Sequence, residues 1–333
     1  MNNIDSDSDP ESLKTIQPNL YPPSFSDFVG NEQAKKILGV TIDAFRTSRM
    51  QPPHMLFLGP RGFGKTALAV LTAKELISIE PDFTYRLVSA KAIENLSDLN
   101  NLMHLKLPDI LILDEIHGLK HSLSDLMHQA MDTYEYSYTD EKHVLRTIKT
   151  SPFCLLGMTT DEGRLTDPFR SRFRKIITLK PYTTAELQII IMNAARNNRI
   201  LIDNTAAFEL AARCNGVPRL ALRNLQNAYE YALKSGGSGK VDYKTACDSL
   251  ELNDIDPRGL CWQQRAILNC LNSQPHPIGV DNIAYRIGIS KLAIEAFYEP
   301  FLIEVNFMEK SSKGRFITPL GKSYISSMKT CFK

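Results

Sequence analysis

The sequence predicts an α/β fold in which a parallel β-sheet covered by helices is followed by an all-helical domain and a small C-terminal domain. Short apolar runs alternate with helical periodicity over residues 25–182, and the pattern is nearly all helical over 183–253. A polar linker then precedes residues 260–333. With 333 residues, the chain has room for two or three domains with cores of their own. We therefore expect a tail at 1–18, a sheet domain at 19–182, a helical domain at 183–254 and a C-terminal domain at 255–333.

The composition excludes a strongly basic or acidic protein. Hydrophobic residues make up 43% and charged residues 23%, and 39 basic against 37 acidic residues leave a net charge of +2. A net charge near zero does not exclude a basic patch on one domain. The longest apolar runs, such as Ile110–Leu113, are far shorter than the roughly 20 residues of a membrane span. We expect no membrane contact.

The first 18 residues are polar and acidic, with little to bury. We expect a disordered, solvated tail, and no signal peptide because no apolar stretch is present. The cysteines form no C-x-x-C pair and no histidines cluster, which predicts neither a zinc site nor a disulfide framework. They are Cys154, Cys214, Cys247, Cys261, Cys270 and Cys331. A reducing, cytoplasmic location follows as an expectation.

Four apolar runs are predicted to be strands, and a helix over Lys65–Ser78 follows the first. Because strands alternate with helical sequence, the sheet should be parallel and covered on both faces. The runs are Met55–Leu58, Ile110–Leu113, Phe153–Thr159 and Ile176–Leu179.

The segment between residues 132 and 149 has a different pattern. Tyr134, Tyr136 and Tyr138 alternate with polar residues ahead of a polar middle at 139–143. This predicts a protruding β-hairpin with Tyr136 and Tyr138 exposed beside its tip. A capped edge ribbon without a partner is the alternative.

The helical domain should begin at a capping residue, either Thr183 or Thr184, with Glu186 near the third position. A turn at Gly216-Val217-Pro218 precedes a helix over Arg219–Lys234.

The C-terminal segment predicts the winged-helix pattern of three helices followed by a hairpin. Trp262, Phe297 and Tyr298 are interpreted as core residues of this domain. The predicted elements are helices over Leu260–Leu271, Val280–Ile287 and Lys291–Ile303, a strand pair around Lys313-Gly314 and a final helix from Gly321.

The run Gly59-Pro60-Arg61-Gly62-Phe63-Gly64-Lys65-Thr66 matches G-x-x-x-x-G-K-[ST] between a predicted strand and a helix. In such a loop the glycines turn backbone N–H groups toward a phosphate chain at a helix N-terminus. Lys65 would reach the β- and γ-phosphates of ATP, and Thr66 would offer its hydroxyl to Mg²⁺. An ordinary glycine-rich turn is the alternative.

Asp114 and Glu115 end a run of four aliphatic residues. Both carboxylates should therefore emerge at the carboxyl end of a buried strand, where open α/β sheets bind ligands. Asp114 would hold Mg²⁺ through water, and Glu115 would orient and polarise the attacking water. Outside this context, such a pair is more often a helix cap.

In their order along the chain, these elements resemble an AAA+ ATPase, and several motifs are similar to those of RuvB, the bacterial Holliday-junction branch-migration motor. The resemblance covers about residues 20–325. Its motifs are Asp114-Glu115-Ile116-His117, Gly157-Met158-Thr159-Thr160, Pro168-Phe169-Arg170-Ser171-Arg172-Phe173, Gly216-Val217-Pro218-Arg219 and Tyr298-Glu299-Pro300-Phe301-Leu302.

The resemblance implies three further catalytic roles. Thr160 resembles the first sensor of the γ-phosphate or attacking water, and Arg219 the second sensor, which brings the helical lid onto the phosphates. Arg172 resembles an arginine finger that reaches a neighbouring subunit's nucleotide, which implies a homohexamer. Besides Lys65, Thr66 and Arg219, the resemblance implies further residues that contact the nucleotide. They are Leu20, Tyr21, Gly62, Gly64, Ala67, Asp132, Thr133, Tyr134 and Tyr182.

The chain departs from the family pattern at several positions. Tyr21 stands where Arg is usual, Ala67 replaces a second Thr after Lys65, and Asp161 replaces Arg after Thr160. The 134–149 hairpin is a few residues shorter and less aliphatic at its tip. In RuvB that hairpin docks onto RuvA. This chain would therefore have a different partner or a weaker version of the same contact, with a RuvC-like resolvase as a further possible partner.

The predicted wing is rich in basic residues. Lys310, Lys313 and Arg315 surround Gly314, and residues 310–333 contain no Asp or Glu. A tight turn would present all three charges to one DNA backbone. A solvated charged face is the alternative.

We therefore expect an ATP-driven motor acting on duplex DNA at Holliday junctions in recombination and repair. One alternative is a clamp-loader-like or mobile-element AAA+ assembly switch without processive translocation. Another is a winged-helix regulator whose ATPase only gates DNA binding.

Overall fold

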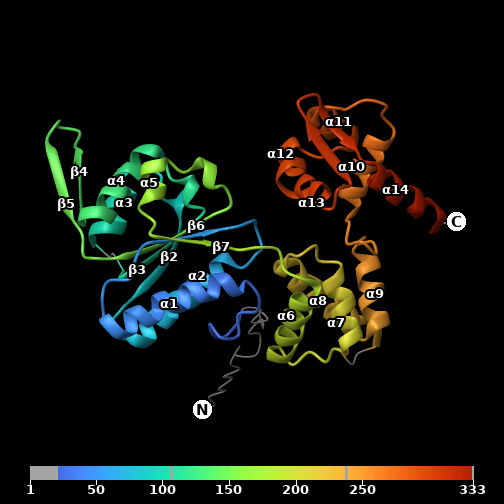
Figure 1. Ribbon diagram of the computed structural model, residues 1–333, viewed down its shortest axis with the longest axis horizontal. Coiled ribbons are helices and arrows are strands. Elements are labelled where there is room, and N and C mark those ends of the chain that lie inside the picture. Colours follow the sequence, from blue (N-terminus) through green and yellow to red (C-terminus); the bar gives the residue numbers. More distant parts are fainter. Residues whose placement is uncertain (1–21, 106–107, 237–238, 332–333) are drawn as a thin grey trace, which may run out of the picture.

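The computed structural model describes residues 22–105, 108–236 and 239–331. The tail expected at 1–18, together with Leu20 and Tyr21, lies outside the described residues. Within them, a sheet domain is followed by a helical lid, and the C-terminal domain lies next to the lid (Figure 1). No described helix has both the length and the apolar character needed to cross a membrane.

Among the described residues, the sheet of the first domain has five parallel strands in the order β2-β3-β6-β1-β7, which confirms the predicted fold class. The edge strand β2 was not predicted, because its side chains are mostly exposed and form no continuous apolar run. The strands are β1 (Met55–Leu58), β2 (Tyr85–Ser89), β3 (Ile110–Asp114), β6 (Cys154–Thr159) and β7 (Lys175–Thr178).

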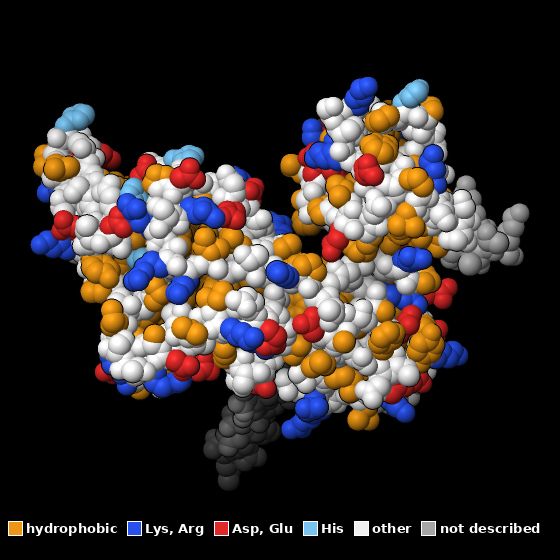
Figure 2. All heavy atoms as spheres, in the orientation of Figure 1, with side chains coloured by type: hydrophobic (Ala, Val, Ile, Leu, Met, Phe, Trp, Pro, Cys, Tyr) orange, Lys and Arg blue, Asp and Glu red, His pale blue; other side chains and the backbone are white. Residues whose placement is uncertain are grey.

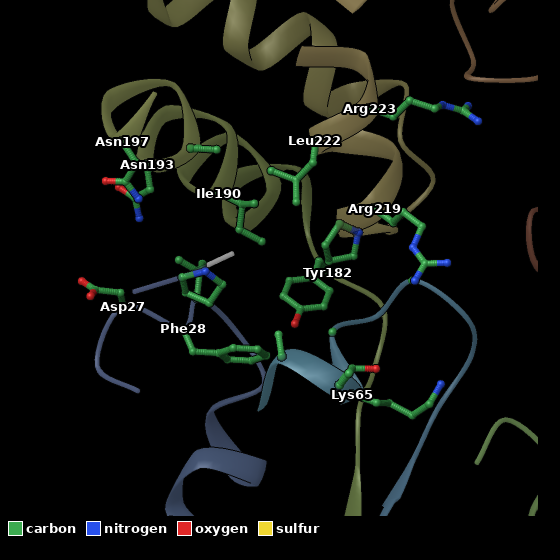
Figure 3. Close-up of a pocket in the computed structure, with 18 of the residues that line it drawn as sticks. Asp27, Phe28, Lys65, Tyr182, Ile190, Asn193, Asn197, Arg219, Leu222 and Arg223 are labelled. Carbon is green, nitrogen blue, oxygen red and sulfur yellow. The ribbon is translucent and has the colours of Figure 1, made fainter. Parts of the chain in front are cut away.

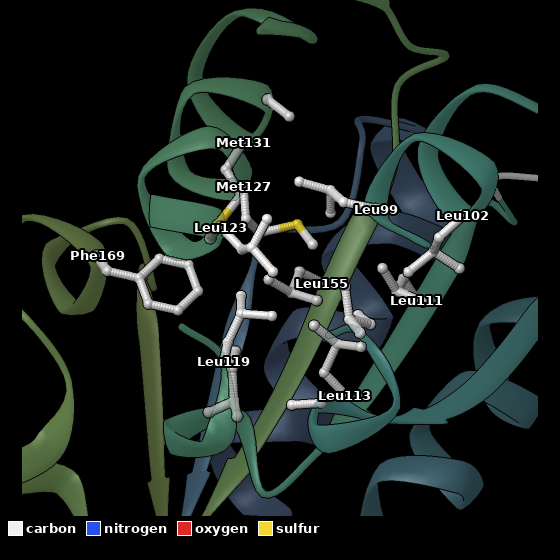
Figure 4. Packing of buried hydrophobic residues seen from close by; sticks show 14 of the residues in the cluster. Leu99, Leu102, Leu111, Leu113, Leu119, Leu123, Met127, Met131, Leu155 and Phe169 are labelled. Atoms are coloured by element: carbon white, nitrogen blue, oxygen red, sulfur yellow. The ribbon is translucent and has the colours of Figure 1, made fainter. Parts of the chain in front are cut away.

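Helices cover both faces of this sheet, since alternate residues of a strand point to opposite sides. Ile110 and Ile112 pack with α1 and α2, whereas Leu111 and Leu113 pack with α3, α4 and α5 (Figure 4). The sheet is therefore buried on both faces, and the carboxyl ends of its strands form one edge. The helices are α1 (Glu32–Ser48), α2 (Lys65–Ile79), α3 (Leu96–Asn100), α4 (His121–Thr133) and α5 (Asp167–Ser171).

The predicted hairpin is confirmed as β4 (Glu135–Thr139) and β5 (Leu145–Lys149), which protrude from the sheet domain (Figure 1). The prediction that Tyr136 is exposed was wrong, because its side chain is 1% exposed. Its hydroxyl donates to Asn100 Oδ1 at 2.7 Å, and Asn100 Nδ2 donates to the Tyr138 hydroxyl at 3.1 Å. The two tyrosines share one strand face, and that face lies on α3.

Four helices form the part of the lid that the structure describes. Thr183, rather than Thr184, caps the first of them: its hydroxyl accepts from Glu186 N, and the Glu186 carboxylate accepts from Thr183 N. Small buried alanines let these helices approach closely. They are α6 (Thr184–Asn197), α7 (Asn204–Ala212), α8 (Pro218–Gly236) and α9 (Tyr243–Leu252).

The C-terminal domain has the predicted winged-helix architecture, but its third helix is interrupted. A π-helical turn at Ile294–Tyr298 separates two short helices, and Pro300 lies in the first turn of the second. The elements are α10 (Trp262–Asn272), α11 (Val280–Ile287), α12 (Lys291–Ala293), α13 (Glu299–Glu304), β8 (Met308–Ser311), β9 (Gly314–Ile317) and α14 (Pro319–Cys331).

Two aromatic residues expected in the core of this domain lie on its surface. Trp262 is 47% and Phe297 is 55% exposed, whereas Tyr298 packs against the core. Trp262 opens α10 and points outward, and Phe297 lies on the side of the π-helical turn that faces the sheet domain.

The linker between the lid and the C-terminal domain is held in place. Asp256 is buried and accepts from the backbone N–H groups of Arg258 and Leu260 at 2.8 and 2.9 Å. Its second oxygen accepts from the Tyr324 hydroxyl of α14. A buried carboxylate with these partners makes the connection stiff, so that movement of the lid should carry the winged helix with it.

Candidate ATPase site

The loop between β1 and α2 is shaped by glycines. Gly59, Gly62 and Gly64 have φ of +146°, +83° and +92°, a backbone region that favours glycine. A Cβ on Gly62 would lie 2.9 Å from Val217 Cγ1, so the residue also permits close approach of the lid. Arg219 N donates to Gly62 O at 3.3 Å across this contact.

Lys65 begins α2 and lies beneath the loop. It is largely buried, and its Nζ donates to the carbonyls of Gly59 at 2.7 Å and Pro60 at 3.0 Å. Burial lowers the pKa of Lys65, and the carboxylates of Glu115 and Asp114 oppose that shift. The structure thus holds the ammonium group of Lys65 at the N-terminus of α2, where anions bind.

Glu115 lies just after β3 in a strained backbone conformation. Its φ is +51°, which costs a non-glycine residue about 1–2 kcal/mol, and Asp114 Oδ1 accepts from Glu115 N at 3.0 Å. Thr160 Oγ1, just beyond the end of β6, donates to Glu115 Oε2 at 3.2 Å. The Glu115 carboxylate at the end of β3 is therefore held by a residue at the end of the neighbouring strand β6.

His117 is a neighbour of Glu115 to which the sequence assigned no role. Its Nδ1 lies 3.3 Å from Glu115 Oε2 and 2.8 Å from Thr159 Oγ1, and its side chain is largely buried. Burial lowers the pKa of His117, which favours the neutral ring at pH 7. Its place in the Asp-Glu-Ile-His motif was the only sequence signal.

A cavity of about 830 Å³ lies between this loop and the lid. Figure 3 shows Ile190 and Leu222 of the lid facing Phe28 and Tyr182, with Lys65 and Arg219 on one side. Tyr182 is buried and donates to Phe63 O at 3.1 Å, and burial raises the pKa of its hydroxyl to about 12. The sequence-predicted residues that line this cavity are Gly62, Gly64, Lys65, Thr66, Ala67, Asp114, Glu115, Tyr182 and Arg219.

Apart from Arg219, the lid side of the cavity was not predicted from the sequence. Leu222 of α8 lines it, and one face of α6 contributes Ile190, Asn193 and Asn197. Their spacing of three and four residues marks one helical face, but only the fold shows that this face meets the loop. Phe28 of the sheet domain was not predicted either.

The cavity fits a nucleotide with its metal. Cations lie at the loop end and apolar side chains at the other. Among the described residues, no group of three or more His, Cys, Asp or Glu could hold a metal ion by itself. Mg²⁺ commonly takes only one or two protein ligands beside phosphate oxygens, and Thr66 and Asp114 line the same cavity.

Comparisons with known proteins match the chain along most of its length. Residues 20–179 match the family described as the Holliday junction DNA helicase RuvB P-loop domain. Residues 182–256 match the RuvB AAA lid domain, and 257–326 the RuvB C-terminal winged helix domain. The "Holliday junction branch migration complex subunit RuvB 2" of a Synechococcus strain is 33% identical over 312 residues, which covers 92% of this chain and 83% of that protein.

The chain belongs to the RuvB family. A Nostoc protein named as a RuvB subunit is 34% identical over 90% of this chain and 82% of its own length. The structure titled "Thermotoga maritima RuvB Holliday junction branch migration motor" is similar with a TM-score of 0.79. Its identity is 29%, and the match covers 92% of this chain and 98% of that one.

Thr160 does not line the cavity itself but donates to Glu115, which does. Four other described residues that the RuvB resemblance associates with nucleotide do not line the cavity of their own chain either: Asp132, Thr133, Tyr134 and Arg172. Arg172 follows α5, and its Nε lies 2.6 Å from Asp132 Oδ2 in an ion pair not aligned as a hydrogen bond. Thr133 ends α4, and Tyr134 packs edge-on against Phe153. The structure thus gathers these residues around the carboxyl end of α4, apart from Lys65.

The basic wing of this RuvB-family chain differs from the sequence prediction. Arg315 is only 7% exposed and donates to Glu299 and Glu295 at 2.8–3.2 Å, so the prediction that it lies at the tip was wrong. Lys310 pairs directly with Arg315 across the hairpin, and its Nζ lies 3.5 Å from Glu299 Oε1. Lys310 and Arg315 lie directly opposite each other, so their side chains share one face of the β8–β9 hairpin, and that face packs on α13. Lys313 remains exposed in the turn.

Proposed function

We propose that this chain hydrolyses ATP with Mg²⁺ and uses the energy to drive branch migration of Holliday junctions. The observation that carries the proposal is the placement of Glu115, held by Thr160 beside the phosphate loop, in a chain whose three domains all match RuvB. We place the protein in the bacterial cytoplasm, and the five cysteines whose side chains the structure describes, which are all free, fit a reducing compartment.

Hydrolysis would follow from the charges around the cavity. Lys65 would neutralise the β- and γ-phosphates, and Arg219 would bring α8 onto them. Glu115 would orient the attacking water, with Thr160 fixing the carboxylate at 3.2 Å. Bound Mg²⁺ would neutralise phosphate oxygens, with Thr66 as one ligand and Asp114 holding it through water. The adenine base and one edge of the nucleotide would pack against Leu20, Tyr21 and Tyr182.

We propose a ring of six chains because Arg172 does not reach its own site. It is partly exposed beside Asp132 and absent from the lining of its own cavity, as expected for a finger that completes a neighbour's site. Asp132, Thr133 and Tyr134 would belong to the same subunit boundary. The winged-helix domain would bind duplex DNA.

The deciding experiment is a branch-migration assay on a synthetic four-way junction, with and without a RuvA-type protein. We expect ATP-dependent movement of the junction together with continuous ATP turnover. ATP-dependent assembly without processive turnover would favour a clamp-loader-like switch instead. Sequence-selective duplex binding would favour a winged-helix regulator, since a motor depends on phosphates rather than base edges.

We propose that the hairpin tip docks a RuvA-type partner, with a RuvC-like resolvase as a further component. The tip exposes two aliphatic side chains, Val144 at 45% and Leu145 at 68%, next to a turn held by Asp140. Replacing residues 140–144 with a two-residue turn should abolish stimulation of ATPase activity by the partner. Hydrolysis without the partner should stay unchanged, and its collapse would show that the segment is structural.

We propose that the wing contacts duplex DNA through phosphates, using Lys313 and Lys310. Changing both to Ala should weaken binding equally on two unrelated duplexes. It should also make the slope of log affinity against log salt shallower by about two, at about 0.9 per lost contact. Titrations at several salt concentrations measure this, and an unchanged slope would contradict it. Arg315→Ala is not a useful substitute, because it would leave Glu299 buried without its main partner and destabilise the domain by about 3–5 kcal/mol.

A further inference from the structure

Arg61 connects the phosphate loop to the winged-helix domain. Its side chain is 53% exposed, and its Nε lies 3.7 Å from Glu115 Oε1. The guanidinium carbon also lies 5.6 Å from the centre of the Phe297 ring, within the range of a cation–π contact. One side chain thus lies between the carboxylate assigned to water activation and a residue of the DNA-contacting domain.

The partners of Glu115 divide between its two oxygens. Oε2 has Thr160 and His117, which belong to the sheet domain itself. Oε1 has Arg61 as its ion-pair partner. A general base must present an oxygen within hydrogen-bond reach of the water it activates. Of these three groups, Arg61 is the one that also touches another domain, so it is the one that domain movement can displace.

Phe297 is suited to a contact that forms and breaks. It lies on the π-helical turn, outside the core of its domain, and is 55% exposed. An exposed cation–π contact contributes about 0.5–1 kcal/mol, too little to lock two domains together. Figure 2 shows the sheet domain and the winged-helix domain separated by a notch on the viewed face. Few other contacts therefore oppose their separation on that side.

We propose that Arg61 is a positioning residue that couples the winged-helix domain to Glu115. While that domain is docked, Phe297 holds the guanidinium beside Glu115 Oε1 and restrains the carboxylate. When the domain moves, Arg61 is released and Oε1 becomes available to water. The position of the DNA-contacting domain then sets the rate of hydrolysis. This inference rests on the proposed role of Glu115 in water activation.

The test compares full-length variants by kcat and KM for ATP without DNA. Phe297→Leu keeps an apolar side chain and removes the ring face, and Arg61→Ala removes the cation. Phe297→Leu should raise kcat about two- to fivefold, the fold-change that corresponds to one exposed cation–π contact. Its KM should change less than kcat, because Phe297 does not line the cavity. Phe297→Tyr, which keeps a ring face, should restore the original rate.

A double-mutant comparison tests whether the two residues act together. Adding Phe297→Leu to Arg61→Ala should raise kcat no further, because the ring acts only through the cation. Two matched controls should leave kcat unchanged. Arg49→Ala removes an equally exposed arginine paired with Glu80, and Phe208→Leu alters a phenylalanine of the lid that is 52% exposed.

Three results would overturn the inference: an unchanged kcat in both single variants, a lowered kcat in both, or fully additive effects in the double variant. A failure of the proposed function is distinguishable, because it would appear as near-normal turnover in Glu115→Gln. If Glu115→Gln is inactive while Arg61→Ala and Phe297→Leu behave as the original chain, Glu115 keeps its role and only the coupling is wrong.

Discussion

Glu115→Gln should bind ATP with near-normal affinity and lose hydrolysis, whereas Lys65→Ala should lose nucleotide binding itself. The reason is that the two side chains would meet different parts of the substrate. Lys65 would contact phosphates that carry charge before the reaction, and Glu115 would act on the attacking water. General-base catalysis contributes about 10²–10⁴-fold in rate, so turnover in Glu115→Gln should fall by at least that range.

The glutamine variant changes little else in the structure. Its amide oxygen can still accept from Thr160 Oγ1, which lies 3.2 Å from Glu115 Oε2. Equilibrium nucleotide binding and phosphate release should both be measured. Lys74→Ala is a suitable control for Lys65→Ala, because Lys74 is an exposed lysine on the same helix. Near-normal phosphate release from Glu115→Gln would refute the assignment of this carboxylate.

Arg172→Ala should bind ATP normally but hydrolyse it about 10³-fold or more slowly, the scale of an arginine finger. Its loss should not unfold the domain, because its partner Asp132 is 39% exposed and such surface pairs contribute about 0–1 kcal/mol. Arg170→Ala is the matched control, since Arg170 lies on α5, which Arg172 directly follows, and pairs with Glu162.

Mixing Arg172→Ala with Lys65→Ala subunits should restore part of the activity. A site with an intact Lys65 from one mutant can receive an intact Arg172 from its neighbour. In a randomly mixed ring with head-to-tail interfaces, about a quarter of the sites would be complete. Mass spectrometry of the intact rings should establish that the subunits mix. If they do and no activity returns, Arg172 acts within its own chain or not at all.

The sequence predicted the sheet domain well because its signals are local. A strand buried on both faces must be apolar at every position, which Ile110–Leu113 satisfies. The phosphate loop carries its signal in consecutive glycines, whose positive φ values few other residues tolerate. Asp114 and Glu115 could be placed near the loop because the carboxyl ends of parallel strands lie at one edge of the sheet.

The errors arose where a side chain's surroundings come from distant parts of the chain. The basic sequence around Gly314 correctly predicted a turn, but not that Arg315 would pair with Glu299 of α13. Tyr136 looked exposed because its hairpin protrudes, yet Asn100 of α3 binds its hydroxyl. In both cases the charge or polarity was evident in sequence, and its partner was not.

By itself, the sequence determined the order of domains, the strands and helices with strong periodicity, and the backbone of the phosphate loop. These depend on interactions between residues a few positions apart, which a linear pattern records. Only the tertiary structure decided that α6 closes the cavity with Ile190, that Arg315 is buried, and that Arg61 lies over the ring of Phe297. Arg61 and Phe297 belong to different domains, and no periodicity links them. Their contact exists because separately packed cores bring two surfaces together, and the shape of whole domains sets that arrangement.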